Sequence, residues 1–377
     1  MHDGRQTAQG RLNDKNDIIL QENTLGNKLR AGVESLFWPP HSRLFIKGDR
    51  VNWSLYWDAV ELAEICRKLG IQVVENGSKR LMKNQCLFNM SRYEILENWK
   101  KPRYRIAFPY YHGNPETDEG SRRMLETISR HHAAIDRIQV SCRFMEAVVK
   151  DTGIDPSKVF RIPIGINRRY FPATDEAAKA SARKKLGIPA SAVVAGSFQK
   201  DGEGWQEGLT PKLIKGPDIF LETVGMLKRS VPELHVLLTG PARGYVRRGL
   251  EELHIPFVHR HLDDYTEIGT YYQALDLYIV SSRDEGGPKA VLESMACGVP
   301  LVSTKVGQAT DLVRHGENGF LVDVGDAEAL AHCSLQVLHD SSLRANVIQN
   351  GLATAEANDY RNQLPLWADF MKGFVSC

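Results

Sequence analysis

Two carboxylates frame the stretch of sequence whose residue types suit chemistry best. Glu285 and Glu293 stand with seven residues between them in the segment SSRDEGGPKAVLESMACGVPLV, which covers residues 281–302. Gly286 and Gly287 directly follow the first carboxylate, and glycines without a Cβ let a ligand approach the backbone closely. The pattern predicts a strand, a turn, a helix, a turn and a strand. We therefore expect Glu285 on the first turn and Glu293 inside the helix.

This arrangement suits a ligand that carries both phosphate and hydroxyl groups. The free N–H groups at the start of a helix, with the positive end of its dipole, attract phosphate. A carboxylate accepts hydrogen bonds and donates none, so it suits the hydroxyls of a sugar or of ribose. A nucleotide sugar combines both kinds of group. Two glutamates at this spacing alone would more often be surface or capping carboxylates, so the interpretation depends on the whole block.

The same block resembles the signature of the retaining, nucleotide-sugar-dependent glycosyltransferases of family 4, which have the GT-B fold. Those enzymes carry a Glu, seven residues and a second Glu, followed by a helix of small residues and a Gly-Val-Pro turn. The corresponding residues here are Glu285, Glu293 and the segment 294–300, SMACGVP. The resemblance covers residues 138–322 clearly and residues 43–112 weakly.

The resemblance implies three catalytic residues. Lys215, which precedes Gly216 at a predicted helix start, would hold the donor diphosphate, because an ammonium offsets the charge that grows on the departing phosphate. Glu285 would contact the hydroxyls of the transferred sugar, and His112, which follows a strand, would reach the same sugar. Glu293 would hold the ribose diol. Judged without the resemblance, Lys215 is more often an exposed lysine and His112 a polar loop residue.

Further donor contacts are expected from loops of the second half of the chain. They would come from Gly287, Lys289, Ala290, Gly240, His261 and Leu262. Relatives usually add an arginine where this chain has Gly196-Ser197, so Lys200 or Lys212 in the polar insert is the hypothetical replacement. Relatives also have a backbone donor at the position of Pro288, and proline has none.

The sequence predicts neither a metal nor a cofactor; the nucleotide sugar itself is the substrate. No D-x-D pair follows a strand at the expected cleft, and Asp263-Asp264 fits a helix start better. Relatives with this fold act without a bound metal and use lysine and helix dipoles instead. The six cysteines are scattered without close pairs, so they predict neither a zinc site nor a disulfide framework. We expect reduced thiols in a cytoplasmic protein.

Length and composition predict a protein of two domains. The chain has 377 residues, and single cores usually stop growing at about 250–300 residues. A net charge of +2 indicates no nucleic-acid partner, and no apolar run approaches the ~20 residues of a membrane span. The polar N-terminus is no secretory signal. Arg122, Arg123 and Arg130 would allow a peripheral contact with the inner face of a membrane, although a solvated helix face is the commoner role.

Short apolar runs alternate with helical patterns along both halves, which predicts an α/β fold with parallel sheets. We expect two Rossmann-like, doubly wound domains facing across a cleft, the GT-B arrangement that the resemblance implies. Residues 1–170 would form the acceptor-side domain and residues 171–359 the donor-binding domain. The last helix, within residues 360–377, would pack back on the first domain. Locally, Ser141 is expected to cap a helix, and Arg243 to lie on a basic surface helix.

The combined prediction is a retaining glycosyltransferase that needs no metal. It would move a hexose from a UDP- or GDP-sugar to a hydroxyl of a glycan or lipid-linked acceptor, as in polysaccharide biosynthesis. Two alternatives stay open: a non-catalytic nucleotide-sugar-binding protein, and another enzyme on the same fold, such as a sugar-nucleotide epimerase. An epimerase needs additional acid–base carboxylates at the cleft, and the sequence does not single any out.

Overall fold

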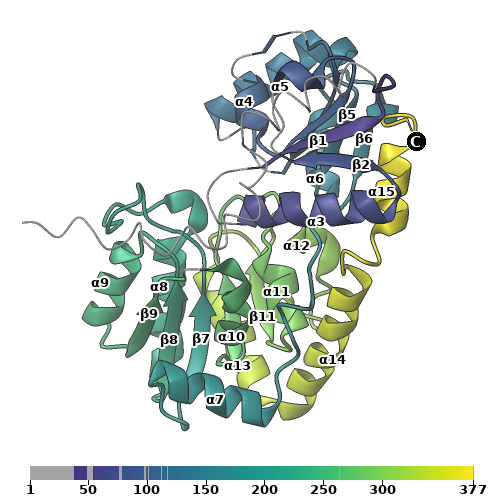
Figure 1. Ribbon diagram of the computed structural model, residues 1–377. Coiled ribbons are helices and arrows are strands. Elements are labelled where there is room, and N and C mark those ends of the chain that lie inside the picture. Colours follow the sequence, from purple (N-terminus) through teal and green to yellow (C-terminus); the bar gives the residue numbers. More distant parts are fainter. Residues whose placement is uncertain are drawn as a thin grey trace, which may run out of the picture.

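Two parallel six-stranded sheets frame the molecule in the residues that the structure describes (Figure 1). The computed structural model describes residues 38–48, 54–75, 79–96, 99–100, 102–111, 113–116, 118–262 and 264–376. The strand orders are β2-β1-β3-β4-β5-β6 and β12-β11-β10-β7-β8-β9, and the pairings are parallel throughout. The predicted pair of doubly wound α/β domains is therefore confirmed.

The first domain consists of the first sheet and its helices. Its strands are β1 (Arg43–Lys47), β2 (Gln72–Glu75), β3 (Cys86–Asn89), β4 (Arg105–Tyr110), β5 (Arg137–Val140) and β6 (Val159–Arg161). Its α-helices are α3 (Ser54–Lys68), α4 (Arg92–Leu96), α5 (Glu119–His131) and α6 (Arg143–Lys150), joined by the short 3₁₀ turns η2 (Lys79–Met82), η3 (His132–Ala134) and η4 (Pro156–Lys158). The four inner strands, β1, β3, β4 and β5, are largely buried because helices cover both faces of the sheet, as parallel sheets require.

The second domain repeats this construction. Its strands are β7 (Val193–Ser197), β8 (Leu234–Thr239), β9 (Phe257–Arg260), β10 (Leu277–Val280), β11 (Leu301–Thr304) and β12 (Phe320–Val322). Its helices are α7 (Glu176–Leu186), α8 (Pro217–Ser230), α9 (Gly244–Glu252), α10 (Ile268–Tyr272), α11 (Ala290–Ala296), α12 (Ala309–Leu312), α13 (Ala327–His339) and α14 (Ser341–Ala357), with the 3₁₀ turns η5 (Leu213–Lys215) and η6 (Tyr265–Glu267). The order of these elements places the loops after β7 and β10 side by side.

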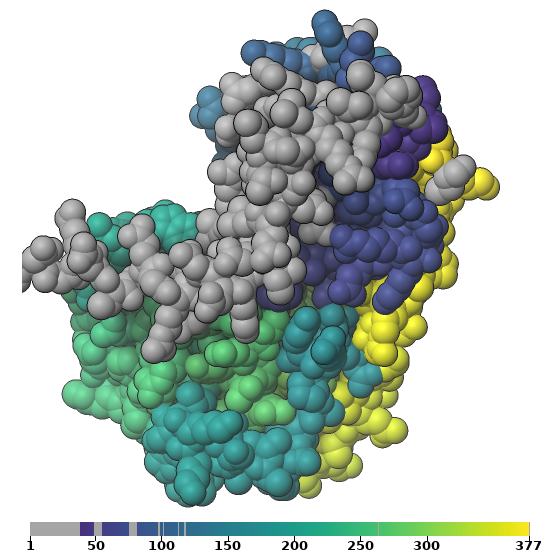
Figure 2. All heavy atoms as spheres, in the orientation of Figure 1, coloured from purple at the N-terminus to yellow at the C-terminus, as the bar shows by residue number. Residues whose placement is uncertain are grey.

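The end of the chain returns to the first domain. Helix α15 (Leu364–Met371) lies beside the first sheet, where its yellow ribbon is visible in Figure 1. Trp367 and Phe370 are buried in one core with Leu44 of β1 and Phe88 of β3. The ring centroids of Phe88 and Phe370 lie 5.7 Å apart. In the space-filling view, dark blue atoms around α3 lie directly on teal atoms of the second domain and beside yellow atoms of the chain end (Figure 2).

Two local predictions are wrong, and both errors involve contacts between distant segments. Cys142, not Ser141, is the residue at the start of α6, and no side chain caps that helix. The Ser141 hydroxyl donates instead to the carbonyl of Gly286 in the second domain, at 2.6 Å. Arg243 is only 1% exposed, although it was expected on the surface. The polar insert after β7 folds over it and supplies a buried carboxylate, Asp201, at 2.9 Å.

Candidate active site

The candidate site lies where the winding direction of the second sheet reverses. Strands β7 and β10 are neighbours, and the chain continues from β7 to β8 and β9 on one side and from β10 to β11 and β12 on the other. Ligands of open α/β sheets bind at the carboxyl ends of strands at such a point. The residues that follow the two strands, Gln199 after β7 and Ser281 to Glu285 after β10, therefore face the place where a ligand is expected.

Lys215 and Glu285 form an ion pair at this place. Lys215 Nζ lies 2.5 Å from Glu285 Oε1, and the two side chains are 23% and 14% exposed. Ser282 Oγ lies 3.0 Å from the same carboxylate oxygen and 3.1 Å from Gln199 Oε1. The Gln199 amide donates to the carbonyl of Lys215 at 2.7 Å. The structure thus brings two of the three predicted catalytic residues together; the third, His112, lies outside the described residues.

Two more lysines surround this ion pair. Burial lowers the pKa of Lys212, and the ammonium groups of Lys215 and Lys200 lower it further, whereas Glu285 acts in the opposite direction. Three cations therefore share a region in which Glu203 and Glu285 are the carboxylates that act on Lys212. Lys200 Nζ also lies 4.6 Å from the centre of the Trp205 ring. An anion with more than one charge would relieve the repulsion among these lysines.

Glu293 is buried on α11, and hydrogen bonds reach both of its oxygens. It is 4% exposed; the Tyr272 hydroxyl donates to Oε2 at 2.8 Å, and the Tyr265 hydroxyl donates to Oε1. Burial raises the pKa of the Glu293 carboxyl, and the nearby Lys289 ammonium opposes that shift. A carboxylate oxygen has a second lone pair, so Glu293 retains acceptor capacity. Its contact with a ribose diol stays a prediction.

Lys289, predicted to meet an acidic group on donor or acceptor, has an acidic partner within the protein. Its Nζ lies 2.7 Å from Asp58 Oδ1 on α3 of the first domain, with side-chain exposures of 15% and 6%. The Tyr360 hydroxyl donates to the same oxygen at 3.0 Å, and the Lys289 ammonium lies 5.0 Å from the centre of the Tyr265 ring. Lys289 therefore joins the two domains, and its role toward a donor stays a prediction.

Gly287 was expected to let a ligand approach its backbone. A Cβ at this position would clash with the side chain of Ile164 from the first domain. The open space beside Gly287 is therefore filled by the domain contact. Ala290 is half-buried at the first position of α11.

The residues expected near the nucleotide base lie at the ends of β8 and β9. Gly240 has a φ of +85°, and its carbonyl oxygen lies 2.7 Å from His259 Nε2. Burial lowers the pKa of His259. His261 is exposed and Leu262 is half-buried against the core of the second domain. These positions fit the rim of the cleft, and their contacts with a base stay predictions.

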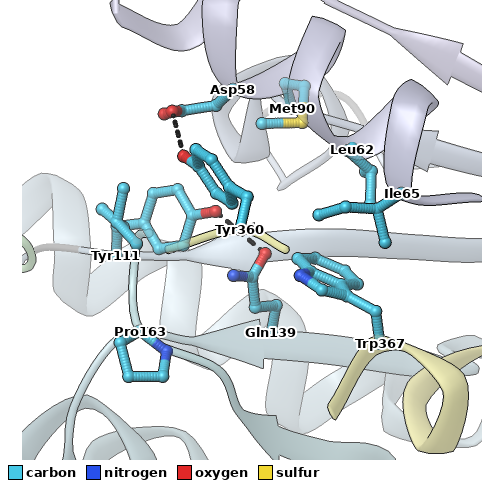
Figure 3. A pocket seen from close by; sticks show the side chains of 10 residues that line it. Asp58, Leu62, Ile65, Met90, Tyr111, Gln139, Pro163, Tyr360 and Trp367 are labelled. Carbon is cyan, nitrogen blue, oxygen red and sulfur yellow. Dashed lines mark hydrogen bonds between the residues drawn. The ribbon is translucent and has the colours of Figure 1, made fainter. Parts of the chain in front are cut away.

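Two pockets lie at the hinge between the domains, next to the candidate site. Asp58, Tyr111, Gln139, Tyr360 and Trp367 contribute polar groups or rings to the first, shown in Figure 3. The Tyr111 hydroxyl donates to Gln139 Oε1 at 2.8 Å, and the Tyr360 hydroxyl points to Asp58 (Figure 3). The second pocket shares Tyr360 and is also lined by Trp57, Glu61, Gly165, Ile166, Asn167, Tyr170, Phe171, Tyr265 and Lys289. Asp58 lines the first pocket and Lys289 lines the second, so both pockets lie beside the ion pair that these two residues form.

Several residues of the site were missed by the sequence reasoning. Asp284 Oδ2 accepts a hydrogen bond from the backbone N–H of Asn114 in the first domain at 3.3 Å. Burial raises the pKa of Asp284, and Glu285 raises it further. Ser282 and Asp284 stand beside Glu285 in the sequence, and this proximity was an available signal. Gln199, Tyr265 and Tyr272 come from three other parts of the second domain, and the sequence contains no signal that links them to Glu285 or Glu293.

The described part of the chain contains no group of three or more His, Cys, Asp or Glu side chains placed to hold a metal ion. None of its helices is both long enough and apolar enough to span a bilayer. Neither observation identifies a substrate, so comparison with known proteins is the next source of information.

Residues 209–354 match the family described as Glycosyl transferases group 1. The lipopolysaccharide core biosynthesis mannosyltransferase LpsB of Rhizobium meliloti is 29% identical over 205 residues, which is 51% of this chain and 53% of that protein. A D-inositol 3-phosphate glycosyltransferase of Thermobispora bispora is 32% identical over 201 residues, 49% of this chain and 43% of that protein. The chain thus matches about half the length of these relatives.

Solved structures share the overall fold. The Anabaena protein HepE, crystallised with UDP-glucose, superposes with a TM-score of 0.69 at 17% identity over 88% of this chain and 99% of that one. The sucrose-phosphate synthase of Thermosynechococcus elongatus superposes with a TM-score of 0.68 at 16% identity over 88% of this chain and 98% of that one. At such identities the likeness establishes the fold, and the predicted GT-B fold is confirmed.

Proposed function

We propose that this protein belongs to the glycosyl transferases group 1 family and transfers a sugar from a nucleotide-diphosphate sugar to a hydroxyl of an acceptor. One observation carries the proposal: the Lys215–Glu285 ion pair at the reversal point of the second sheet, with Lys212 and Lys200 beside it. The lysines suit a diphosphate and the carboxylate suits sugar hydroxyls. Both kinds of recognition group therefore stand where the fold binds ligands.

The ion pair defines the chemistry that these residues perform. When a donor binds, the diphosphate takes over Lys215 Nζ, and Glu285 turns to the hydroxyls of the sugar. As the glycosidic bond to phosphate breaks, negative charge grows on the leaving oxygen, and the fixed ammonium stabilises it. The acceptor hydroxyl attacks the same face of the sugar and gives its proton to the departing phosphate, which retains the anomeric configuration. Retention is inferred from the resemblance of the Glu285–Glu293 block.

The lysines support a reaction without a metal ion. Lys215, Lys212 and Lys200 supply positive charge where a divalent cation would otherwise neutralise the diphosphate. Of the two hypothetical replacements for the family's arginine, Lys212 is the better candidate. Its pKa responds to both Lys215 and Glu285, whereas the Lys200 ammonium lies against the Trp205 ring. The Lys212→Met variant should therefore weaken nucleotide affinity more than Lys200→Met.

The substrate classes follow from the relatives. HepE was crystallised with UDP-glucose, and LpsB is described as a mannosyltransferase of lipopolysaccharide core biosynthesis. We infer a UDP- or GDP-hexose as donor and a glycan or lipid-linked acceptor. Such acceptors are built at the inner face of a membrane, so we place the protein in the cytoplasm near that face.

The test begins with a thermal-shift panel of UDP, GDP, ADP and their common sugars, with EDTA and then with magnesium. We expect one nucleotide family to raise the melting temperature equally in both conditions. Turnover with that donor is then followed by NMR, which reports the anomer of the product. No shift with any nucleotide would overturn the proposal, and a strict magnesium requirement would overturn the metal-free mechanism.

Two departures from the resembled pattern favour the alternative of a non-catalytic nucleotide-sugar-binding protein. The arginine expected at Gly196-Ser197 is missing, and Pro288 has no backbone N–H to donate. The panel separates the two functions. Nucleotide binding without donor hydrolysis or sugar transfer, in wild type and at high enzyme concentration, would establish the binding protein.

A further inference from the structure

A buried arginine with unused hydrogen-bond donors lies at the edge of the first domain. Arg92 is the first residue of α4 and is 4% exposed. Its Nε and Nη1 atoms are buried and have no hydrogen-bond partner within the part of the chain described. Buried polar atoms are paired in the great majority of cases, and an unpaired guanidinium nitrogen is unfavourable. An arginine in this state therefore calls for a partner.

Two tyrosine rings hold the guanidinium in place. Its central carbon lies 4.7 Å from the centre of the Tyr93 ring and 4.5 Å from that of Tyr110. Nη2 donates to the Tyr93 hydroxyl at 3.0 Å. A Cβ on Gly113 would clash with Ser121 Oγ and come within 3.2 Å of the same nitrogen, so the glycine leaves room for the serine first and for the arginine as well. The stacking rings leave the edge of the guanidinium as its binding surface.

Arg92 faces the cleft from the acceptor side. It follows β3, and Tyr110 ends β4, so both stand at the carboxyl ends of neighbouring parallel strands. Asn114 follows Tyr110 closely in the sequence, and its backbone N–H donates to Asp284, the neighbour of Glu285. The Arg92 guanidinium belongs to the first domain, and its charge acts on Asp284 of the second domain, the residue next to Glu285.

Two carboxylates feel the charge of Arg92 without neutralising it at contact distance. The serine hydrogen bonds lower the pKa of Asp118 more than the Arg92 guanidinium does, and burial raises the pKa of Asp284 more than Arg92 lowers it. The Asp118 carboxylate already accepts a hydrogen bond from the backbone N–H of Ser121 at 2.7 Å. Among the described residues neither carboxylate forms an ion pair with Arg92.

We propose that Arg92 binds an anionic group, a phosphate or a carboxylate, on the acceptor. A guanidinium is always charged, and its planar edge fits the oxygens of either group. The anion reaches it when Tyr93 turns or when Asn114 separates from Asp284. An acceptor without the anion would leave the guanidinium unpaired, so the site discriminates against neutral acceptors. This inference rests on the proposed function.

The test uses the full-length protein saturated with the nucleoside diphosphate that gives the thermal shift, so that the lysine site is occupied. Inorganic phosphate, glycerol 3-phosphate and malate are the anionic probes, and glycerol is the neutral one. We expect wild type to bind at least one anionic probe and not glycerol. Phosphate-bearing and carboxylate-bearing probes distinguish the two kinds of anion.

The Arg92→Gln variant should bind the effective probe at least 10-fold more weakly and keep the shift produced by the nucleotide. The matched control is Arg137→Gln, which removes a first-domain arginine that is likewise stacked on a ring, that of Phe160, at 5.2 Å. Unchanged probe affinity in Arg92→Gln, or no anion binding by wild type, would overturn the inference. If Arg92→Gln does not fold, Arg92→Lys, which keeps the charge but loses the planar edge, takes its place. Loss of the nucleotide shift in wild type would instead overturn the proposed function.

Discussion

At the scale of single residues, the two side chains to which we assign catalytic roles neutralise each other. The Lys215 ammonium and the Glu285 carboxylate form a half-buried ion pair. In the proposed reaction a donor would separate them, with the diphosphate and the sugar hydroxyls replacing the partner that each side chain loses. Lys212 remains beside the pair with a lowered pKa, which favours binding of a polyvalent anion over a neutral sugar.

Replacement of Lys215 by methionine should lower turnover by about 10²–10³-fold, the range seen when one preorganised group that stabilises a transition-state charge is removed. The loss occurs because the growing charge on the leaving phosphate has no ammonium at that position. The measurement is kcat with the donor identified by thermal shift. Lys305→Met is the control, since Lys305 pairs with Asp323 on the surface. Full turnover in Lys215→Met would contradict the assigned role.

The raised pKa of Glu293 makes stability depend on pH. Between its ordinary value of about 4.5 and the raised value, the unfolded chain has lost the proton while the folded protein keeps it. Stability therefore falls as pH rises through this window. Glu293→Gln should reduce that fall, measured by urea unfolding at a series of pH values; the remaining slope comes from Glu61 and Asp284, whose pKa values burial also raises. The exposed Glu317→Gln is the control, and identical slopes in Glu293→Gln and wild type would refute the prediction.

At the scale of elements, the insert after β7, which carries Lys200 and Lys212, is a loop ordered by its own hydrogen bonds. A backbone bridge joins Gly202 to Pro211, and Gly244 N–H donates to the carbonyl of Glu207 at 2.7 Å. Beneath it, Arg243 binds Asp201 and also donates to the carbonyls of Ser197 and Thr239. The buried arginine thus ties the insert to the ends of β7 and β8.

Replacement of Arg243 by methionine should loosen the insert, because Asp201 would be left as a buried carboxylate without its cation. Breaking such a pair costs about 3–5 kcal/mol. Hydrogen exchange should rise across residues 199–212, and nucleotide affinity should fall. The Arg243→Met/Asp201→Asn double variant should recover part of the stability. Unchanged exchange in the insert of Arg243→Met would show that the pair does not anchor it.

Gly216 is required between Lys215 and α8. It has a φ of +61°, and a Cβ there would clash with the carbonyl oxygen of Ser281 at the end of β10. Gly216→Ala should therefore cost roughly 3 kcal/mol or more in unfolding free energy. Gly187→Ala is the matched control: its φ is +71° with nothing within 4 Å, so only about 1–2 kcal/mol of backbone strain is expected. Equal costs in urea unfolding would contradict the steric argument.

At the scale of the whole molecule, a set of contacts holds the two domains together beside the site. Ser141 donates to Gly286, and Gln308 Oε1 accepts from the backbone N–H of Ile164 at 2.9 Å. The Lys289–Asp58 pair and α15 complete the connection. The Ser141 and Lys289 contacts lie on the segment after β10 that carries Glu285, so the arrangement of the domains helps to set the position of this segment.

Replacement of Lys289 by methionine should weaken the closed arrangement of the domains, because Asp58 would lose its cation in a buried place. We expect a larger radius of gyration in small-angle scattering and a loss of stability of about 3–5 kcal/mol. The Lys289→Met/Asp58→Asn double variant should recover part of the stability and part of the wild-type radius of gyration. The control is Lys150→Met, whose partner Glu146 lies within the same helix, α6. A scattering curve identical to that of wild type would refute the prediction.

Patterns among neighbouring residues were enough to predict the two-domain α/β fold and many of its elements. Helices such as α5 and α7 have signals that lie within or next to the helix, because an aspartate caps each of them at its first turn. The block around Glu285 and the placement of Glu293 inside a helix followed from residues close together in the chain. Lys215 was singled out by resemblance alone.

The partners of the charged and polar side chains, by contrast, depend on how distant segments pack together. Lys289 pairs with Asp58 across 231 residues, Ser141 turns to Gly286, and Arg243 is buried under the insert. Tyr265 and Tyr272 surround Glu293 although no local pattern marks them. Helix and strand signals depend on neighbours within a few residues, whereas a buried charge takes its partner from whatever the fold brings beside it. The roles of individual charged residues are therefore set by the packing of the two domains.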